Sequence, residues 1–142
     1  MSLVLVFTSM IKWDDKYSVG ISIIDKQHKR LVSIINDAIV VRQHSGDPKM
    51  VLEILDEMTK YAQDHFKTEE SYMKEFHYPE YQLHQEEHIN FSYKTISYRN
   101  KVISGDSQIA NEILEYLTKW LFNHILVTDK KFVDCFKKNG LK

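Results

Sequence analysis

Histidine is the residue type whose placement in this sequence points most directly to chemistry. The chain has seven histidines in 142 residues, and two of them, His44 and His77, fall in expected turns. The other five fall on the apolar stripes of expected helices, at positions where the helical period requires a core side chain: His28, His65, His84, His88 and His124. Glu69 follows His65 by four residues and therefore shares its helix face. Imidazole and carboxylate groups gathered in a core are typical of a metal site.

A metal ion explains this group better than mutual hydrogen bonding does. One buried histidine is ordinarily a hydrogen-bonded core residue, and an isolated HxxxH or HxxxE spacing arises readily by chance. Five buried imidazoles cannot all donate hydrogen bonds to one another, and burying the Glu69 carboxylate without a partner costs several kcal/mol. Imidazole with carboxylate favours iron, zinc or manganese. Because no cysteine belongs to the group, an iron–sulfur cluster and a thiolate zinc site are excluded.

The ligands are too many for one ion. Five histidines and Glu69 would overfill a tetrahedral site, so the sequence predicts two metal ions with a bridging carboxylate between them. Glu69 supplies one bridge, and Asp129, five residues after His124, is the best candidate for a second. A spacing of five does not keep one face of an α-helix, so we expect a break, a wide turn or a π-type distortion between His124 and Asp129.

Long helices must hold these side chains, because the chain has only 4 glycines and 2 prolines. So few turn-forming residues exclude barrels, sandwiches and hairpin-rich folds. Short connections force antiparallel neighbours, so the fold class is all-α, an up-down-up-down four-helix bundle in a single domain. The expected parts of residues 1–142 are an N-terminal arm over 1–19, bundle helices over 21–43, 48–75, 79–103 and 107–125, and a short C-terminal helix over 127–138.

Local signals support two of the helix starts and the packing of the arm. Ser22 and Asp25 have the spacing of a capping box, and Asp47 followed by Pro48 resembles an N-cap and a first helical residue. Trp13 is expected to pack the arm across the bundle.

Composition excludes several classes of partner. Nineteen basic and twenty acidic side chains leave a formal net charge of -1, so we expect no nucleic-acid partner. The apolar stretch 3–7 is too short for a membrane span and lacks the flanks of a signal peptide, so no membrane association is expected. The single cysteine, Cys135, cannot form an internal disulfide. We therefore expect a cytoplasmic protein.

The ligand pattern resembles that of the hemerythrin family, over nearly the whole chain from Ile11 to Phe136. Trp13 and Gly20-Ile21 are similar to the arm of its bacterial members. The matching segments are Asp25-Lys26-Gln27-His28-Lys29, His65-Phe66-xx-Glu69-Glu70, Tyr78-Pro79 before His84-xxx-His88, and Trp120-Leu121-xx-His124-Ile125-xxx-Asp129-Lys130.

The resemblance implies a cofactor of two iron ions (Fe2+/Fe3+) with a bridging oxo or hydroxo group. One iron would be held by His84, His88 and His124, and the other by His28 and His65. Glu69 and Asp129 would bridge them. Counting ligands around two octahedral irons leaves one position open, on the iron held by His28 and His65, and the family binds O2 reversibly there.

Bulky apolar residues next to the ligands are expected to line the O2 pocket: Leu31, Phe66, Trp120 and Leu121. They would exclude water and protons from the open position, although each is also an ordinary core residue. O2 is thus the expected ligand, for carriage, storage or delivery to an oxygen-consuming enzyme. The chain itself is expected not to be an enzyme, because ferritin-like oxygenases resemble four Glu with two His. An O2 or redox sensor using the same site is the alternative, and a zinc or metal-free structural bundle is a more distant one.

Overall fold

The computed structural model describes residues 10–142, and within that range every regular element is a helix. The expected all-α four-helix bundle is therefore confirmed. The apolar stretch 3–7 lies outside the described residues, as does the first half of the arm. In chain order the elements are η1 (Asp15–Tyr17), α2 (Ser22–Gln43), α3 (Pro48–Glu75), α4 (Tyr81–Ile103), α5 (Ile109–Trp120), a π-helical segment η2 (Leu121–Thr128), a 3-10 segment η3 (Asp129–Phe132) and α6 (Val133–Lys138).

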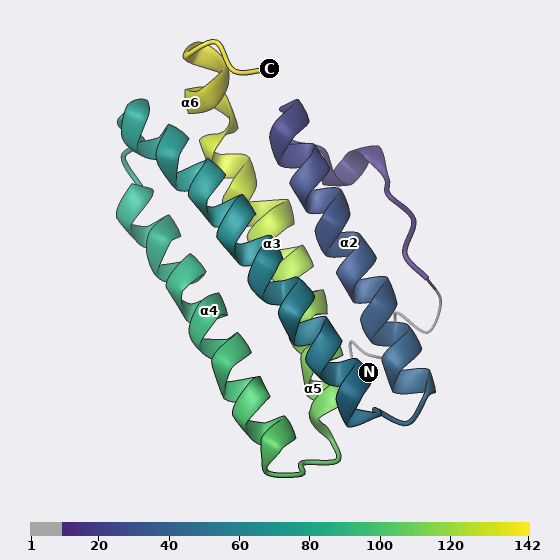
Figure 1. Ribbon diagram of the computed structural model, residues 1–142. Helices are drawn as coiled ribbons and strands as arrows, with labels where there is room; N and C mark the ends of the chain where they lie inside the picture. The colour runs from purple at the N-terminus through teal and green to yellow at the C-terminus, as the bar shows by residue number, and fades with distance from the viewer. Residues whose placement is uncertain (1–9) are drawn as a thin grey trace.

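The four long segments run antiparallel to their chain neighbours, and Figure 1 shows α3 between α2 and α4. α5 and its continuation η2 lie behind α3 and close the bundle by packing against α2 and α4. α6 sits at the end of the bundle where α2 begins and α3 ends. Within the described residues, no helix combines the length and the apolar character that a membrane span requires.

Turn chemistry sets where the helices begin and end. Asp47 accepts a hydrogen bond from the Lys49 backbone N–H at 2.9 Å, and Pro48 occupies the first helical position of α3. Gly46, at φ +67°, forms the turn before it, a conformation that a residue with a Cβ rarely adopts. α4 begins at Tyr81, two residues later than expected at 79, because His77 at φ +55° and Tyr78 still belong to the turn.

The structure corrects the start of α2. The helix begins at Ser22, whose neighbour Ile21 is the N-cap residue and makes no side-chain capping bond. Asp25 reaches back past the helix start and accepts hydrogen bonds from Ser18 Oγ at 2.5 Å and from the Val19 backbone N–H at 2.8 Å. The spacing of Ser22 and Asp25 thus predicted a capping box that does not form, because Asp25 binds the arm instead.

The C-terminal part of the bundle also differs from the expected helices over 107–125 and 127–138. The regular α-helix covers only Ile109–Trp120, and the terminal helix only Val133–Lys138. The chain between them stays helical but changes pitch twice, first to π and then to 3-10. The expected distortion between His124 and Asp129 is confirmed, and its extent is larger than a single break.

The apolar core consists of two clusters that lie on either side of the polar side chains. On α2, Ile24 belongs to one cluster and Leu31 to the other, with His28 between them. On α3, His65 and Glu69 lie close to Phe66 of the first cluster, while Met73 of the second lies one turn beyond Glu69. The polar layer is thus closed at both ends by apolar packing.

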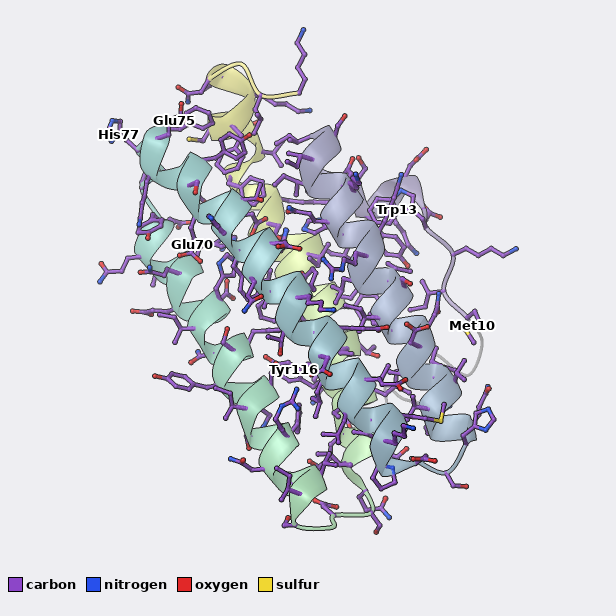
Figure 2. The ribbon with its side chains drawn as sticks, viewed as in Figure 1. Met10, Trp13, Glu70, Glu75, His77 and Tyr116 are labelled. Carbon is purple, nitrogen blue, oxygen red and sulfur yellow. The ribbon has the colours of Figure 1, made fainter. Side chains whose placement is uncertain are left out.

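The described part of the arm, from residue 10, lies along α2 and is fixed to it at two places. The Ile11 backbone donates to Asn36 Oδ1 at 2.7 Å, and Asn36 Nδ2 donates back to the Ile11 carbonyl at 2.9 Å. Asp25 fixes the second place, as described above. Trp13 packs against the larger apolar cluster with the Lys29 ammonium 5.4 Å from its ring centroid, and Figure 2 shows it on the arm side of α2.

Replacing Asp25 tests the anchoring of the arm. Asp25→Ala removes two hydrogen bonds to a charged acceptor, so the free energy of unfolding should fall by about 1–3 kcal/mol in urea titrations. Lys26→Ala, at the exposed neighbouring position, serves as the matched control and should change stability by less than about 0.5 kcal/mol. Equal stability of the two variants would show that the two Asp25 hydrogen bonds contribute nothing to stability.

Candidate metal centre

The seven side chains expected to bind metal come together in the middle of the bundle. Each is buried, with no more than 2% of its surface exposed. α2 supplies His28, α3 supplies His65 and Glu69, α4 supplies His84 and His88, η2 supplies His124, and Asp129 is the first residue of η3. Four parts of the chain that are far apart in sequence, with η2 and η3 as one continuous part, therefore place polar groups in one buried volume.

Their ligand atoms form two overlapping groups, and within each group all of them lie within 4.8 Å of one another. The three-histidine group consists of His84, His88 and His124 with Glu69 and Asp129. The two-histidine group consists of His28 and His65 with the same two carboxylates. Because both carboxylates are shared, the arrangement can accommodate two ions with Glu69 and Asp129 between them.

Helix geometry explains how each segment presents its side chains. On α3, His65 and Glu69 are one turn apart, and His65 Nε2 lies 3.3 Å from Glu69 Oε1. His84 and His88 repeat this spacing on α4. His124 and Asp129 are five residues apart, and the π-helical segment turns both inward through a hydrogen bond from the Asp129 N–H to the His124 carbonyl. As a result His124 Nε2 lies 2.8 Å from Asp129 Oδ1.

Partners outside the cluster fix the protons of the histidine rings. His88 Nδ1 lies 2.9 Å from Glu70 Oε2, and a carboxylate can only accept, so this ring nitrogen carries the proton. Gln27 donates its amide Nε2 to Thr68 Oγ1 at 2.9 Å, which turns its Oε1 toward His65 Nδ1 at 2.8 Å. His65 Nδ1 is therefore also a donor. In neutral rings of this kind the Nε2 lone pairs face the interior of the cluster.

This orientation points the Nε2 lone pairs of His65 and His88 toward other ring nitrogens and the two carboxylates. His28 Nε2 and His65 Nε2 are 3.2 Å apart, and His88 Nε2 and His124 Nε2 are 3.3 Å apart. Among residues 10–142, Glu69 Oε2 has no hydrogen-bond partner. Only cations among these lone pairs, protons or metal ions, can satisfy so many buried acceptors at once. The residues present therefore fit a metal centre, and nitrogen with carboxylate oxygen suits iron.

In the metal-free protein, protons take the place of the cations. Burial alone lowers the pKa of His84, but hydrogen bonds with Asp129 and Glu69 outweigh it and raise the pKa to about 10. At His124 burial again lowers the pKa, but the negative charge of Asp129 outweighs this effect and raises the pKa to about 9. Burial favours the neutral carboxyl of Asp129, but the charge of His124 prevails and holds its pKa well below the usual range. The centre thus stabilises positive charge strongly.

Aromatic rings cover the ligands on the side of the larger apolar cluster. The ring of Phe66 stacks on His88 with centroids 3.9 Å apart, and that of Trp120 stacks on His124 at 4.0 Å. Leu31 and Leu121 are wholly buried in the same cluster. All four residues expected to line a pocket therefore lie in the apolar layer next to the centre. Their role toward O2 stays a prediction.

Several residues that contact the ligands were not expected from the sequence. Tyr61 stacks on His65 at 5.1 Å and accepts a hydrogen bond from Trp120 Nε1 at 3.3 Å. Its spacing of four residues before His65 was an available signal. Gln27, Glu70 and Glu87 contact ring nitrogens from the outside, and the sequence carries no comparable signal for them, because polar residues on the outer faces of helices are common.

Comparison with known proteins agrees with this geometry. Residues 19–136 match the family described as the hemerythrin HHE cation binding domain. The chain is 34% identical over 129 residues to the bacteriohemerythrin of Stenotrophomonas maltophilia, covering 91% of this chain and 83% of that protein. It is 30% identical to the bacteriohemerythrin of Clostridium acetobutylicum, covering 88% and 100%. A crystal structure of a hemerythrin mutant superposes with a TM-score of 0.80 at 23% identity, covering 89% of this chain and 97% of that chain.

The stability of the metal-free protein should depend on pH through His84 and His124. Both pKa values are raised from 6.5 on folding, to about 10 and about 9, so the folded state binds more protons than the unfolded state between these limits. The contribution is present in full below about pH 6.5. It should be lost as pH rises through 9 to 10, and urea unfolding of the metal-free chain at several pH values measures this.

Two controls show whether His84 and His124 cause this pH dependence. The variant with both His84→Gln and His124→Gln should lose most of this pH dependence, and the metal-loaded protein should show less of it because the metal replaces the protons. Metal-free protein whose stability is constant from pH 6.5 to 9.5 would contradict the raised pKa values of His84 and His124.

Proposed function

Since this chain belongs to the hemerythrin family, we propose that it binds O2 reversibly at a centre of two non-haem iron ions, for carriage, storage or delivery of oxygen. The two overlapping ligand groups described above would hold the two ions. When bound, the iron pair supplies the electrons and the open coordination position that O2 requires.

One observation carries the proposal: all five histidines and both carboxylates of the expected set converge, and both carboxylates are common to the two groups. The bundle oxygenases and ferroxidases use an oxygen-rich set of four Glu with two His. Here nitrogen ligands outnumber carboxylates, which favours reversible binding and a non-enzymatic role over the oxidation of a substrate.

The residues around the centre would support reversible O2 binding. Phe66 and Trp120 stack on ligand rings, and Leu121 fills the adjacent core without measurable exposure. This apolar cover would exclude water and free protons, which would otherwise promote irreversible oxidation of the loaded centre by O2. The hydrogen bonds that His65 and His88 donate to Gln27 and Glu70 hold these two rings with their Nε2 atoms facing inward.

Sensing of O2 or of redox state is the second candidate, and a contact between the arm and the ligand segment supports it. The ammonium of Lys130, next to Asp129, donates a hydrogen bond to the Lys16 carbonyl at 3.0 Å. A shift of η3 on ligand binding would therefore reach the arm. Hydrogen exchange of residues 10–20 that changes between deoxygenated and oxygenated protein would favour sensing, and unchanged exchange would favour carriage.

Metal analysis and spectroscopy test the proposed function. Purified protein should contain about two irons per chain. The reduced protein should develop a visible absorption band when air is admitted and lose the band under argon over repeated cycles. One iron per chain, zinc alone, or irreversible bleaching would contradict O2 carriage.

The apolar cover can be tested at Leu121. Leu121→Ser should admit water beside the centre and increase the rate of autoxidation, followed as the loss of the O2-dependent band with time. Leu117→Ser, one turn further from His124 and also wholly buried, controls for the loss of core packing. Equal autoxidation rates in the two variants would show that Leu121 has no particular role at the centre.

A further inference from the structure

The outer partners of the ring nitrogens differ between the two ligand groups. In the three-histidine group, His88 Nδ1 bonds Glu70 and His124 Nδ1 lies 3.3 Å from Glu87 Oε2. In the two-histidine group, the partner of His65 is the neutral amide of Gln27. His28 Nδ1 has no hydrogen-bond partner among residues 10–142. Glu70 is thus a hydrogen-bonded carboxylate partner, and Glu87 lies within ion-pair distance of His124 Nδ1 without forming a hydrogen bond. No carboxylate supports the Nδ1 atoms of the two-histidine group.

Glu70 is held firmly in its place. Its Oε2 accepts from His88, and its Oε1 accepts from Gln85 Nε2 at 3.3 Å. The side chain is 21% exposed and lines a groove of about 600 Å³ between α3 and α4, the position at which Figure 2 shows it. Phe66 stacks on the face of the His88 ring while Glu70 bonds its edge. The ring thus has a single orientation.

Glu87 makes a weaker contact. Its distance to His124 Nδ1 is longer, and 44% of its side chain is exposed to solvent, which screens its charge. Thr128 Oγ1 donates to its other oxygen at 3.4 Å. Stacking on Trp120 gives the His124 ring a second support. The influence of Glu87 on its histidine should therefore be smaller than that of Glu70.

A carboxylate partner changes how well a histidine binds metal. When a carboxylate accepts the Nδ1 proton, negative charge shifts toward Nε2, and the lone pair there becomes a stronger donor to a cation. An amide oxygen orients the ring equally well but adds no negative charge. Loss of such an outer partner ordinarily lowers metal affinity by about 10- to 100-fold.

We propose that Glu70, with a smaller contribution from Glu87, is a positioning residue that makes the three-histidine group the tighter metal position. This group then fills first, and the His28–His65 group is the position that fills last and empties first. The inference deepens the proposed function and rests on it, because it requires that both groups take a metal ion.

Titration of the metal-free protein with Zn2+ tests the order of filling without redox chemistry. Nitrogen NMR of 15N-histidine-labelled protein follows each ring, and a competing chelator gives the two affinities. In the unmodified chain the signals of His84, His88 and His124 should shift before those of His28 and His65. Glu70→Gln keeps an acceptor for His88 but removes the charge, so the affinity of the three-histidine position should fall by about 10- to 100-fold.

Matched variants separate charge from general effects. Glu87→Gln should lower the affinity of the same position by about tenfold or less. Glu86→Gln, at the exposed neighbouring position on α4, should leave both affinities unchanged. Gln27→Glu gives His65 a carboxylate partner and should tighten the two-histidine position, which narrows the gap between the two affinities.

Three outcomes are informative. Weakening of the three-histidine position alone in Glu70→Gln, with the unfolding midpoint of the metal-free chain unchanged, supports the inference. Equal weakening of both positions, or of neither, overturns it and leaves the proposed two-ion centre standing. Uptake of a single Zn2+ per chain by the unmodified protein overturns the two-ion centre and the inference with it.

Discussion

Nitrogen lone pairs and carboxylates that converge in one buried volume are the constraint on which the rest of this structure depends. Outer partners place the protons of His65 and His88 on Nδ1, so the Nε2 atoms and the two carboxylates meet as acceptors in a volume closed to water. Such an arrangement is unfavourable unless cations occupy it. The need for positive charge therefore follows from hydrogen bonding alone, before any relative is considered.

The bundle serves this constraint by holding ligands from distant segments at fixed separations. Apolar clusters on both sides of the polar layer keep it dry, and aromatic rings stacked on His88 and His124 leave the imidazoles little freedom to rotate. The π-helical segment is the departure from regular α-helix that brings Asp129 to the centre. It is required because Asp129 must face the same volume as His124 from a distance of five residues.

Periodicity was sufficient to predict the helices, the inward positions of the five histidines and the distortion before Asp129. These features follow from side-chain spacing along one helix, which the sequence displays directly. The Asp25 contacts and the later start of α4 were not predictable in this way, because Asp25 binds the arm and His77 adopts a positive φ. Glu70 and Glu87 were also not predictable as partners of the histidines, because outward carboxylates on helices have many uses and the histidines that they contact lie on other elements.

X-ray absorption at the iron edge tests the central claim, a centre of two ions with shared carboxylates, most directly. The anaerobically reconstituted protein should show nitrogen and oxygen ligands, the outer-shell scattering of several imidazoles, and an iron–iron vector of about 3–4 Å. Spectra that lack an iron–iron vector while the chain carries two irons, or that show a single iron with few imidazoles, would contradict the account.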